Sequence, residues 1–235
     1  HDNAALFYAL KHCKHLHCVF VFDKTILDAL SNKADRRVEF IWESCMALKT
    51  KLQGFGGDLH LMYDHAETAI PELATKLGVQ AVFTNKDYEP AAIHRDITVG
   101  KTLQGKGIEL FRFKDQAIFE EDEVLTQAGK FFSVFTPFKN ACLKKLDAFH
   151  LTPYPSEARV VSLAKDSGLP VPSLEDMGFK RTNLLDMIKP GEEGALDAFE
   201  DFLNRMDKYK VARDFPAIKG VSYLSVHNRF GTISI

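Results

Sequence analysis

The chain has 235 residues, of which 46% are hydrophobic and 26% charged, and its formal net charge is −2. This composition is typical of an ordinary globular protein, and the charge balance excludes a polycation that coats nucleic acid without specificity. No apolar run reaches the roughly 18 residues of a membrane-spanning helix, the start lacks the pattern of a signal peptide, and the four cysteines form no C-x-x-C pair, so we expect a reduced, cytoplasmic protein.

The first half of the chain alternates helical and extended patterns. Apolar spacing predicts helices at residues 3–13, 38–52, 69–77 and 90–104, and strands at residues 15–22, 58–64, 79–85 and 108–113. Gly54 is expected to supply the left-handed residue that ends the long helix. Strands separated by helices are typical of βαβ units, so we predict an α/β fold with a doubly wound, Rossmann-like parallel sheet.

The pattern changes after residue 130. A new helix is predicted at residues 135–146, with Thr136 as its N-cap and Pro137 in the first helical position, where no N–H is needed. Five prolines then punctuate polar sequence between residues 150 and 190. They predict a long connector that is extended rather than packed.

A last helix is predicted from residue 192 to about residue 209. It carries a stripe of apolar residues at helical spacing: Leu196, Phe199, Leu203 and Met206. We therefore divide the chain into an α/β domain (1–130), a helix with an interdomain connector (131–190) and the beginning of an all-helical domain (191–235).

Three patterns approach well-known sites but fail on spacing. The segment "HCKHLHC" (12–18) matches no zinc-ligand spacing and spans a helix end, a turn and a strand start, so we predict no metal site. The segment "VGKTLQGKG" (99–107) is not a P-loop, because Arg95 stands where the first glycine is required. The segment "GVSYL" (220–224) is not a nucleophile elbow, because Leu224 replaces the second glycine.

The segment "GVSYLS" (220–225) is predicted to be a loop that enters a helix. Gly220 permits a tight turn, while Ser222 and Ser225 offer hydroxyl groups near the first free N–H groups of the helix. Tyr209, at the end of the preceding helix, adds a phenolic O–H. These donors together favour a bound phosphate. From spacing alone, a capped helix with ordinary serines explains the same residues equally well.

The longer segment "YKVARDFPAIKGVSYLSVHNRFGTIS" (209–234) resembles the flavin-phosphate segment of the DNA photolyase/cryptochrome family. The family pattern is Y-x-x-x-R-D-x-P-x-x-x-G-T-S-x-L-S followed by Phe-Gly. The segment "VFTPFKNACLKKL" (134–146) is similar to the family's helix after its α/β domain. The segment "NKDYEP" with the "RD" that follows it, and the opening "HDNAAL", are further marks. The resemblance covers essentially the whole chain and is strongest to class I cyclobutane pyrimidine dimer photolyases.

This resemblance implies that the α/β domain is a light-harvesting antenna domain and that the helical domain binds FAD. It assigns five residues to contacts with the phosphates and ribityl chain of FAD: Tyr209, Val221, Ser222, Leu224 and Ser225. Val221 stands where the family usually has threonine, so the hydroxyl contact is lost while the backbone N–H remains. The catalytic residues are expected in the family's C-terminal region, so none is assigned within this chain.

Lys139 and Arg213 match positions that touch DNA phosphates in similar enzymes, and single cations of this kind position the backbone without reading bases. The implied activity is that of a deoxyribodipyrimidine photo-lyase, which repairs cyclobutane pyrimidine dimers in ultraviolet-damaged DNA. The damaged pair leaves the duplex, and light-excited, reduced FAD donates the electron that splits the ring.

The sequence departs from the family in three places. The family begins with a central strand directly before "HDN", so we expect a gap in the sheet or an altered fold. Most of the helical domain is absent downstream, so this chain alone is expected neither to hold FAD tightly nor to repair DNA. The positions that bind a folate antenna read Ala91, Ala92 and Ser31. A folate, flavin or deazaflavin antenna, or none, therefore stays open.

Two other classes of function stay open. A cryptochrome-type blue-light photoreceptor would be recognised by a long polar C-terminal tail. A freestanding nucleotide-binding α/β module would be favoured if the native protein ended near Ile235. We prefer the photolyase because Lys139 and Arg213 retain the phosphate-contacting cations, and we expect a monomer that acts on DNA and does not bind membranes.

Overall fold

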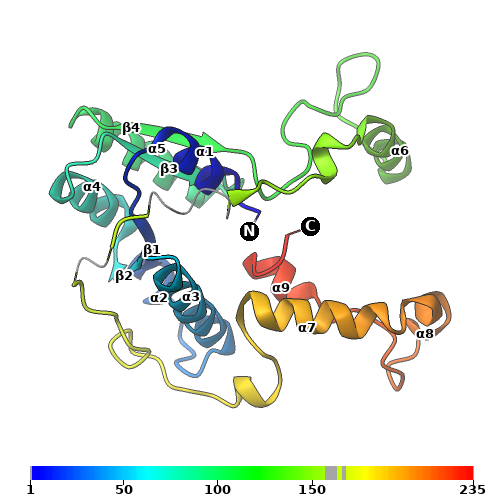
Figure 1. The fold of residues 1–235 in the computed structure, drawn as a ribbon. Helices are drawn as coiled ribbons and strands as arrows, with labels where there is room; N and C mark the ends of the chain where they lie inside the picture. The colour runs from blue at the N-terminus through cyan, green and yellow to red at the C-terminus, as the bar shows by residue number, and fades with distance from the viewer. Residues whose placement is uncertain (1, 157–162, 166–167, 235) are drawn as a thin grey trace. The chain divides into compact units, whose positions relative to one another are not determined.

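The computed structural model describes residues 2–156, 163–165 and 168–234 (Figure 1). It confirms an α/β fold whose paired strands are parallel. Contacts divide the chain into two compact units, one formed by residues 1–16 and 66–162 and the other by residues 17–65 and 163–235. The division into three domains stays a prediction. No helix in the described part of the chain has both the length and the apolar character to cross a membrane.

The first unit contains a two-stranded sheet. Its strands β3 (Ala81–Asn85) and β4 (Glu109–Phe113) pair in parallel, with Ala81 opposite Glu109. The helices of this unit are α1 (Ala4–His12), α4 (Ala66–Lys76), α5 (Pro90–Gln104), α6 (Phe135–Lys145) and the short 3-10 helix η1 (Phe149–Leu151). A small core joins α4 and α5 to the sheet through Ala74, Val99, Leu103 and Ile108.

Hydrogen bonds to its first turn fix the start of α1. The first N–H groups of any helix lack intrahelical partners. Here the N–H of Ala4 donates to Asp115 Oδ1 at 2.8 Å, and the N–H of Ala5 donates to Asn85 Oδ1 at 2.9 Å. Asn3 caps the helix with its own side chain. The helix is thereby tied to the end of β3 and to the segment after β4.

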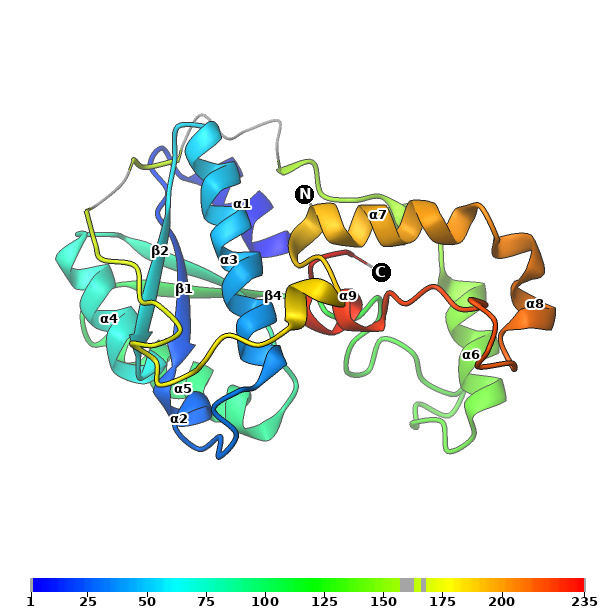
Figure 2. The same ribbon diagram turned by 90° about the horizontal axis from the view of Figure 1, so that it is seen from below.

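The second unit contains the other two-stranded sheet, in which β1 (Cys18–Asp23) pairs in parallel with β2 (Leu59–Asp64). The long helix α3 (Arg36–Gly54) lies along this sheet (Figure 2). The other helical elements are α2 (Lys24–Leu27), η3 (Leu184–Asp186), α7 (Gly191–Leu203), η4 (Met206–Lys208), α8 (Tyr209–Ala212) and α9 (Ser225–Phe230). The core of the unit includes Phe22, Leu27, Val38, Cys45, Leu52, Leu59 and Leu61.

Residues 168–190 of the proline-rich connector pack within the second unit, while its residues 157–162 and 166–167 lie outside the described part of the chain. Leu174, Met177 and Phe179 are each at most 2% exposed and belong to the core beside α3. The buried carboxylate of Glu39 on α3 accepts hydrogen bonds from the N–H and the hydroxyl of Thr182. The prediction of an extended, unpacked connector is therefore wrong for this stretch, because its apolar residues bury enough surface to hold the chain in place.

The structure also tests the predicted sheet and the predicted ends of two helices, α3 and α6. Within the described residues β1 pairs with β2 and β3 with β4 in two separate sheets, and the expected gap in the sheet stays a prediction. α3 includes Gly54, and the left-handed residue after it is Gly56, with φ 80°. α6 begins at Phe135 after Val134, without a side-chain cap. The assignment of Thr136 as its N-cap is therefore wrong.

Two helices expose apolar residues. Leu196, Phe199 and Leu203 on α7 are between 39% and 47% exposed. No residue of α6 is buried, and Phe135, at the start of that helix, is 73% exposed. Leu196, Phe199 and Leu203 of the predicted stripe lie on α7 and are largely uncovered in the described part of the chain, whereas Met206 lies in η4, because the helix ends at Leu203 and not near residue 209.

Candidate functional site

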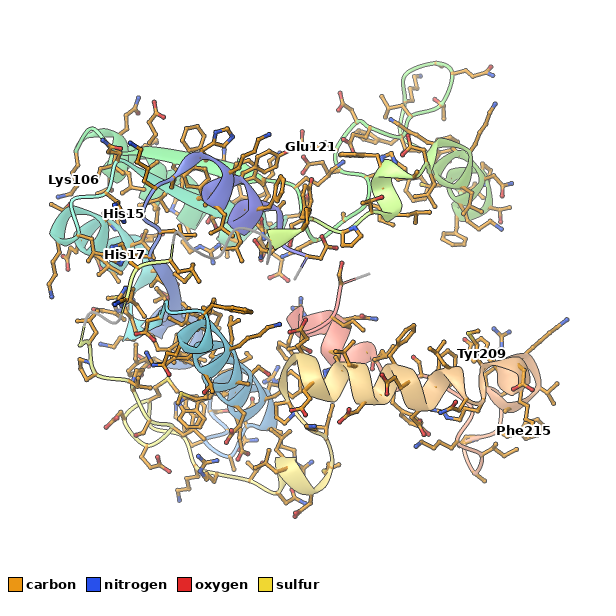
Figure 3. All side chains as sticks on the ribbon, viewed as in Figure 1. His15, His17, Lys106, Glu121, Tyr209 and Phe215 are labelled. Atoms are coloured by element: carbon orange, nitrogen blue, oxygen red, sulfur yellow. The ribbon has the colours of Figure 1, made fainter. Side chains whose placement is uncertain are left out.

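Most of the residues that the sequence singles out lie between α8 and α9 in the second unit. After α7 and η4, α8 turns the chain, and Figure 3 labels Tyr209 and Phe215 at this end of the segment. The chain then runs back to α9, which contacts α7. We call residues 219–225 the return loop.

The return loop has an uncommon backbone conformation. Gly220 is buried, and a Cβ at this position would lie 2.5 Å from the carbonyl carbon and oxygen of Ala212. Tyr223 has φ 57°, which for a non-glycine residue costs on the order of 1–3 kcal/mol. Leu224 returns to the right-handed region with φ −81° and ψ −3°. Neighbouring residues of opposite hand turn their N–H groups to one side and form a concave nest for an anion.

The return loop offers backbone N–H groups and two hydroxyl groups as donors. Within the described residues, no acceptor bonds the N–H of Ser222, Tyr223 or Ser225. The N–H of Leu224 makes one long bond of 3.4 Å to Ser222 Oγ. α9 has only six residues, so its dipole adds less than a full helix would. The loop thus fits an anion chiefly through its own N–H and hydroxyl groups.

Tyr209 lies at the start of α8, and its ring contacts two neighbouring side chains. The ring meets Phe202 edge to face with centroids 5.8 Å apart, and the guanidinium carbon of Arg213 lies 5.7 Å from the ring centroid. Its hydroxyl makes no hydrogen bond within the described residues and stays open to a ligand. Val221 is 37% exposed and offers only its backbone N–H.

The two expected DNA-contacting cations lie in different units. Lys139 on α6 is exposed, and no carboxylate in the described part of the chain pairs with it. Arg213 is about half exposed, and its Nε lies 3.6 Å from Asp214 Oδ1. Lys139 is therefore free to meet a phosphate, whereas Asp214 partly offsets the charge of Arg213.

Sequence reasoning missed a charged cluster beside the return loop. Arg205 pairs with Asp201 on α7 at 2.9 Å, and its Nη1 donates to the carbonyl oxygen of Lys219 at 2.8 Å. Lys219 Nζ lies 2.9 Å from Asp201 Oδ1. Hydrogen bonds from Lys219 and Arg205 hold the pKa of Asp201 below its usual range. The i,i+4 spacing of Asp201 and Arg205 is visible in the sequence, but the contact with Lys219 is not.

The histidines near β1 form a pair. His17 Nδ1 lies 3.3 Å from His60 Nε2, and in the described part of the chain no three His, Cys, Asp or Glu side chains gather as a metal-binding group. Burial raises the pKa of the Cys18 thiol to about 11, with a further contribution from Asp58. The thiolate that a metal requires is therefore disfavoured.

The positions matched to an antenna site carry little polar chemistry. Ala91 and Ala92 lie in the first turn of α5, where Ala92 is buried and Ala91 exposed. Neither methyl group can donate or accept a hydrogen bond. Ser31 is exposed in the segment after α2, in the other unit.

Comparison with known proteins decides the family. The family profile described as DNA photolyase matches residues 1–158, which is more than half of the chain. The chain belongs to the DNA photolyase family. It is 30% identical to the deoxyribodipyrimidine photo-lyase of Synechococcus sp. (strain ATCC 27144 / PCC 6301 / SAUG 1402/1), with 100% of this chain and 49% of that enzyme covered. It is 32% identical to an uncharacterized 31.6 kDa protein from the atpI 5' region of Synechococcus sp. (strain PCC 6716), with 100% of this chain and 82% of that protein covered.

Solved photolyases share the fold of this family member. A class III photolyase from Agrobacterium tumefaciens matches with a TM-score of 0.82 and 28% identity, over 99% of this chain and 48% of that one. An archaeal photolyase from Sulfolobus tokodaii, solved with two FAD molecules, matches with a TM-score of 0.76 and 26% identity, over 99% of this chain and 50% of that one.

The chain thus spans about half the length of the named photolyases that it matches. The expected family and fold class are confirmed. The assignment to class I stays a prediction, because a class III enzyme is among the matched structures.

Proposed function

We propose that this chain is part of a light-dependent enzyme that repairs cyclobutane pyrimidine dimers in DNA with an electron from reduced FAD, as class I photolyases do. The observation that carries the proposal is the return loop. Its N–H groups at Ser222, Tyr223 and Ser225 have no acceptor within the described residues, and its sequence matches the family's flavin-phosphate pattern. This donor set suits a diphosphate.

In this proposal the return loop holds the diphosphate of FAD. The N–H groups of Val221, Ser222, Tyr223 and Ser225 and the two serine hydroxyls donate to its oxygens, and Tyr209 adds its phenolic O–H. Leu224 lies beside the ribityl chain. Bound in its reduced form, FAD supplies the electron that opens the cyclobutane ring. The residues of this chain orient the cofactor and leave the remaining contacts to the rest of the protein.

Lys139 and Arg213 are proposed to position damaged DNA through its phosphates. Each cation that neutralises one phosphate contributes roughly 0.9 to the slope of log affinity against log salt concentration. Lys139→Gln should therefore weaken binding to damaged and undamaged duplexes alike and lower that slope by about one. A loss confined to damaged DNA would mean that Lys139 contacts the lesion instead.

The proposed second chromophore is of the flavin or deazaflavin type. Ala91 and Ala92 lack the polar groups of a folate site, and the S. tokodaii relative was solved with two FAD molecules. We also propose a cytoplasmic monomer. The absorption spectrum of the protein purified in the dark tests the chromophore, because a folate band in place of a second flavin or deazaflavin contribution would contradict it.

The full-length gene product provides the test of repair. Blue light should remove dimers from an ultraviolet-irradiated oligonucleotide, while a dark sample should not. Replacing both Ser222 and Ser225 by alanine should lower FAD content without changing the circular dichroism spectrum. Flavin-containing protein that leaves the dimers intact under light would favour a photoreceptor, and protein without flavin would favour a nucleotide-binding module. The 235-residue chain alone is expected to show no repair.

A further inference from the structure

We propose that Arg205 is a positioning residue that fixes the shape of the return loop and thereby tunes its affinity for the diphosphate of FAD. The ligand in this statement rests on the proposed function. The positioning itself concerns this chain alone and can be measured without a ligand.

Arg205 contacts the return loop at its first residue, Lys219, and at Tyr223, while its ion pair with Asp201 holds it to α7. Its Nε and Nη2 donate to Asp201 Oδ2 at 3.2 and 2.9 Å, and its Nη1 donates to the carbonyl oxygen of Lys219 at 2.8 Å. The guanidinium carbon lies 5.4 Å from the ring centroid of Phe202 and 5.8 Å from that of Tyr223. The Arg205 side chain is only 17% exposed. One planar group thus links α7 to the first residue of the loop and to its left-handed residue.

These contacts determine where the loop's N–H groups point. The peptide unit between Lys219 and Gly220 is held at both ends, because Arg205 binds its oxygen and its N–H donates to the carbonyl oxygen of Ile218 at 2.7 Å. Tyr223 has φ 57°, and a left-handed residue of this type persists only where its surroundings over-determine it. Without Arg205, the carbonyl loses its partner and Tyr223 loses the cation beside its ring.

Charge alone offers a different explanation, and a lysine separates the two. Arg205 and Lys219 both neutralise Asp201, so removing Arg205 also removes a positive charge near the loop. Lysine keeps the charge but lacks the planar fork that bonds a carboxylate and a carbonyl at once. Positioning predicts that Arg205→Lys behaves like Arg205→Gln, whereas an effect of charge predicts that Arg205→Lys behaves like the wild type.

Hydrogen exchange measured by mass spectrometry tests the positioning in the chain itself. The Gly220 amide is the probe, because its N–H donates to the carbonyl oxygen of Ile218 at 2.7 Å. Both Arg205 variants should exchange it roughly tenfold faster or more, as expected for the loss of a hydrogen bond to a charged group, and should exchange the amides of β1 and β2 at the wild-type rate. Arg181→Gln is the matched control, because Arg181 bonds Glu43 and its guanidinium carbon lies 5.1 Å from the ring centroid of Trp42, while no bond or ring contact joins it to the loop within the described residues. Wild-type exchange of the loop in Arg205→Lys would overturn the proposal.

A second variant keeps the test decisive if Arg205→Gln destabilises the whole unit. In a Tyr223→Gly background the left-handed residue is no longer strained, so Arg205→Gln should accelerate loop exchange less than it does in the wild-type background. An undiminished effect would mean that Arg205 does not act through Tyr223, which would refute its role in holding that residue.

Flavin binding by the full-length protein tests the consequence for the ligand. The Arg205 variants should weaken FAD binding about tenfold and leave riboflavin, which lacks the diphosphate, unaffected. Equal weakening of both would show that Arg205 supports the fold instead of the loop. If wild-type protein binds no FAD, the proposed function fails, while the exchange experiment still decides whether Arg205 positions the loop.

Discussion

Replacing Gly220 by alanine should displace the return loop, because the new methyl group would collide with backbone. Its Cβ would lie 2.5 Å from the carbonyl carbon and oxygen of Ala212 and 2.9 Å from the Ala212 Cβ. Ordinary carbon contacts are about 3.5–4.0 Å, so the overlap is about 1 Å. A rotamer change cannot relieve it, since the atoms it meets are backbone and a methyl group.

The expected cost is that of overpacking, about 1–3 kcal/mol. This free energy corresponds to a roughly 5- to 150-fold change in the equilibrium constant between the native and the displaced conformation of the loop. Hydrogen exchange at residue 220, whose N–H donates to the carbonyl oxygen of Ile218 in the native loop, should rise by that factor. Trp42, the single tryptophan of the chain, lies in the same unit, and its fluorescence in urea reports whether the rest of that unit stays folded.

Gly54→Ala is the matched control for Gly220→Ala. A Cβ at Gly54 meets no heavy atom within 4 Å, and the residue lies in the last turn of α3. Alanine should therefore be neutral there or stabilise the helix by about 0.5–1 kcal/mol. If loop exchange in Gly220→Ala were within twofold of that in Gly54→Ala, the close approach of Gly220 to Ala212 would not exist in solution.

Three further predictions concern the second unit and use urea unfolding followed by Trp42 fluorescence. Lys49→Met should cost about 3–5 kcal/mol, because it leaves the buried carboxylate of Asp58 without the ammonium 2.6 Å away; a loss below 1 kcal/mol would contradict this. Phe179→Ala should cost about 3–5 kcal/mol, because the ring is 2% exposed, and a neutral result would show that the connector does not pack. Burial lowers the pKa of His227, so the unfolded chain binds this proton more readily than the folded chain. The contribution of neutral His227 to the free energy of unfolding should therefore be fully present above about pH 6.5. Below that pH it should fall by at most about 1.4 kcal/mol per pH unit. His227→Gln should flatten that slope, and an unchanged slope would assign it to other groups.

Local sequence signals predicted most of the first unit. The helix expected at residues 90–104 is observed as Pro90–Gln104, because a proline suits the first turn and the apolar residues Val99 and Leu103 recur at helical spacing. The same kind of signal predicted a long helix that reaches Gly54. It misplaced the left-handed residue by two positions, because Gly54 and Gly56 have equal conformational freedom and the apolar spacing does not distinguish them.

The sequence predicted which residues belong to the candidate site, but it did not predict the contacts that hold them in place. The local pattern pointed to Ser222 and Ser225 and indicated that Gly220 serves a tight turn, and the family resemblance assigned the two serines to FAD. The close approach to Ala212 and the bond from Arg205 depend on the path of the chain between α8 and α9, and sequence spacing carries no information on that path. The packed connector was missed for the same reason, since its burial depends on α3, far away in the sequence.

α6 has 11 residues, none of them buried. A lone helix of that length is only marginally stable in water, since most helical stability in proteins comes from covering an apolar face. In solution, the unaccompanied polypeptide should fray along this segment and show less helical signal than the structure implies. Lys139 would then move with the frayed backbone. Its affinity for a nucleic acid phosphate therefore depends on a partner surface that covers Phe135 and Phe138.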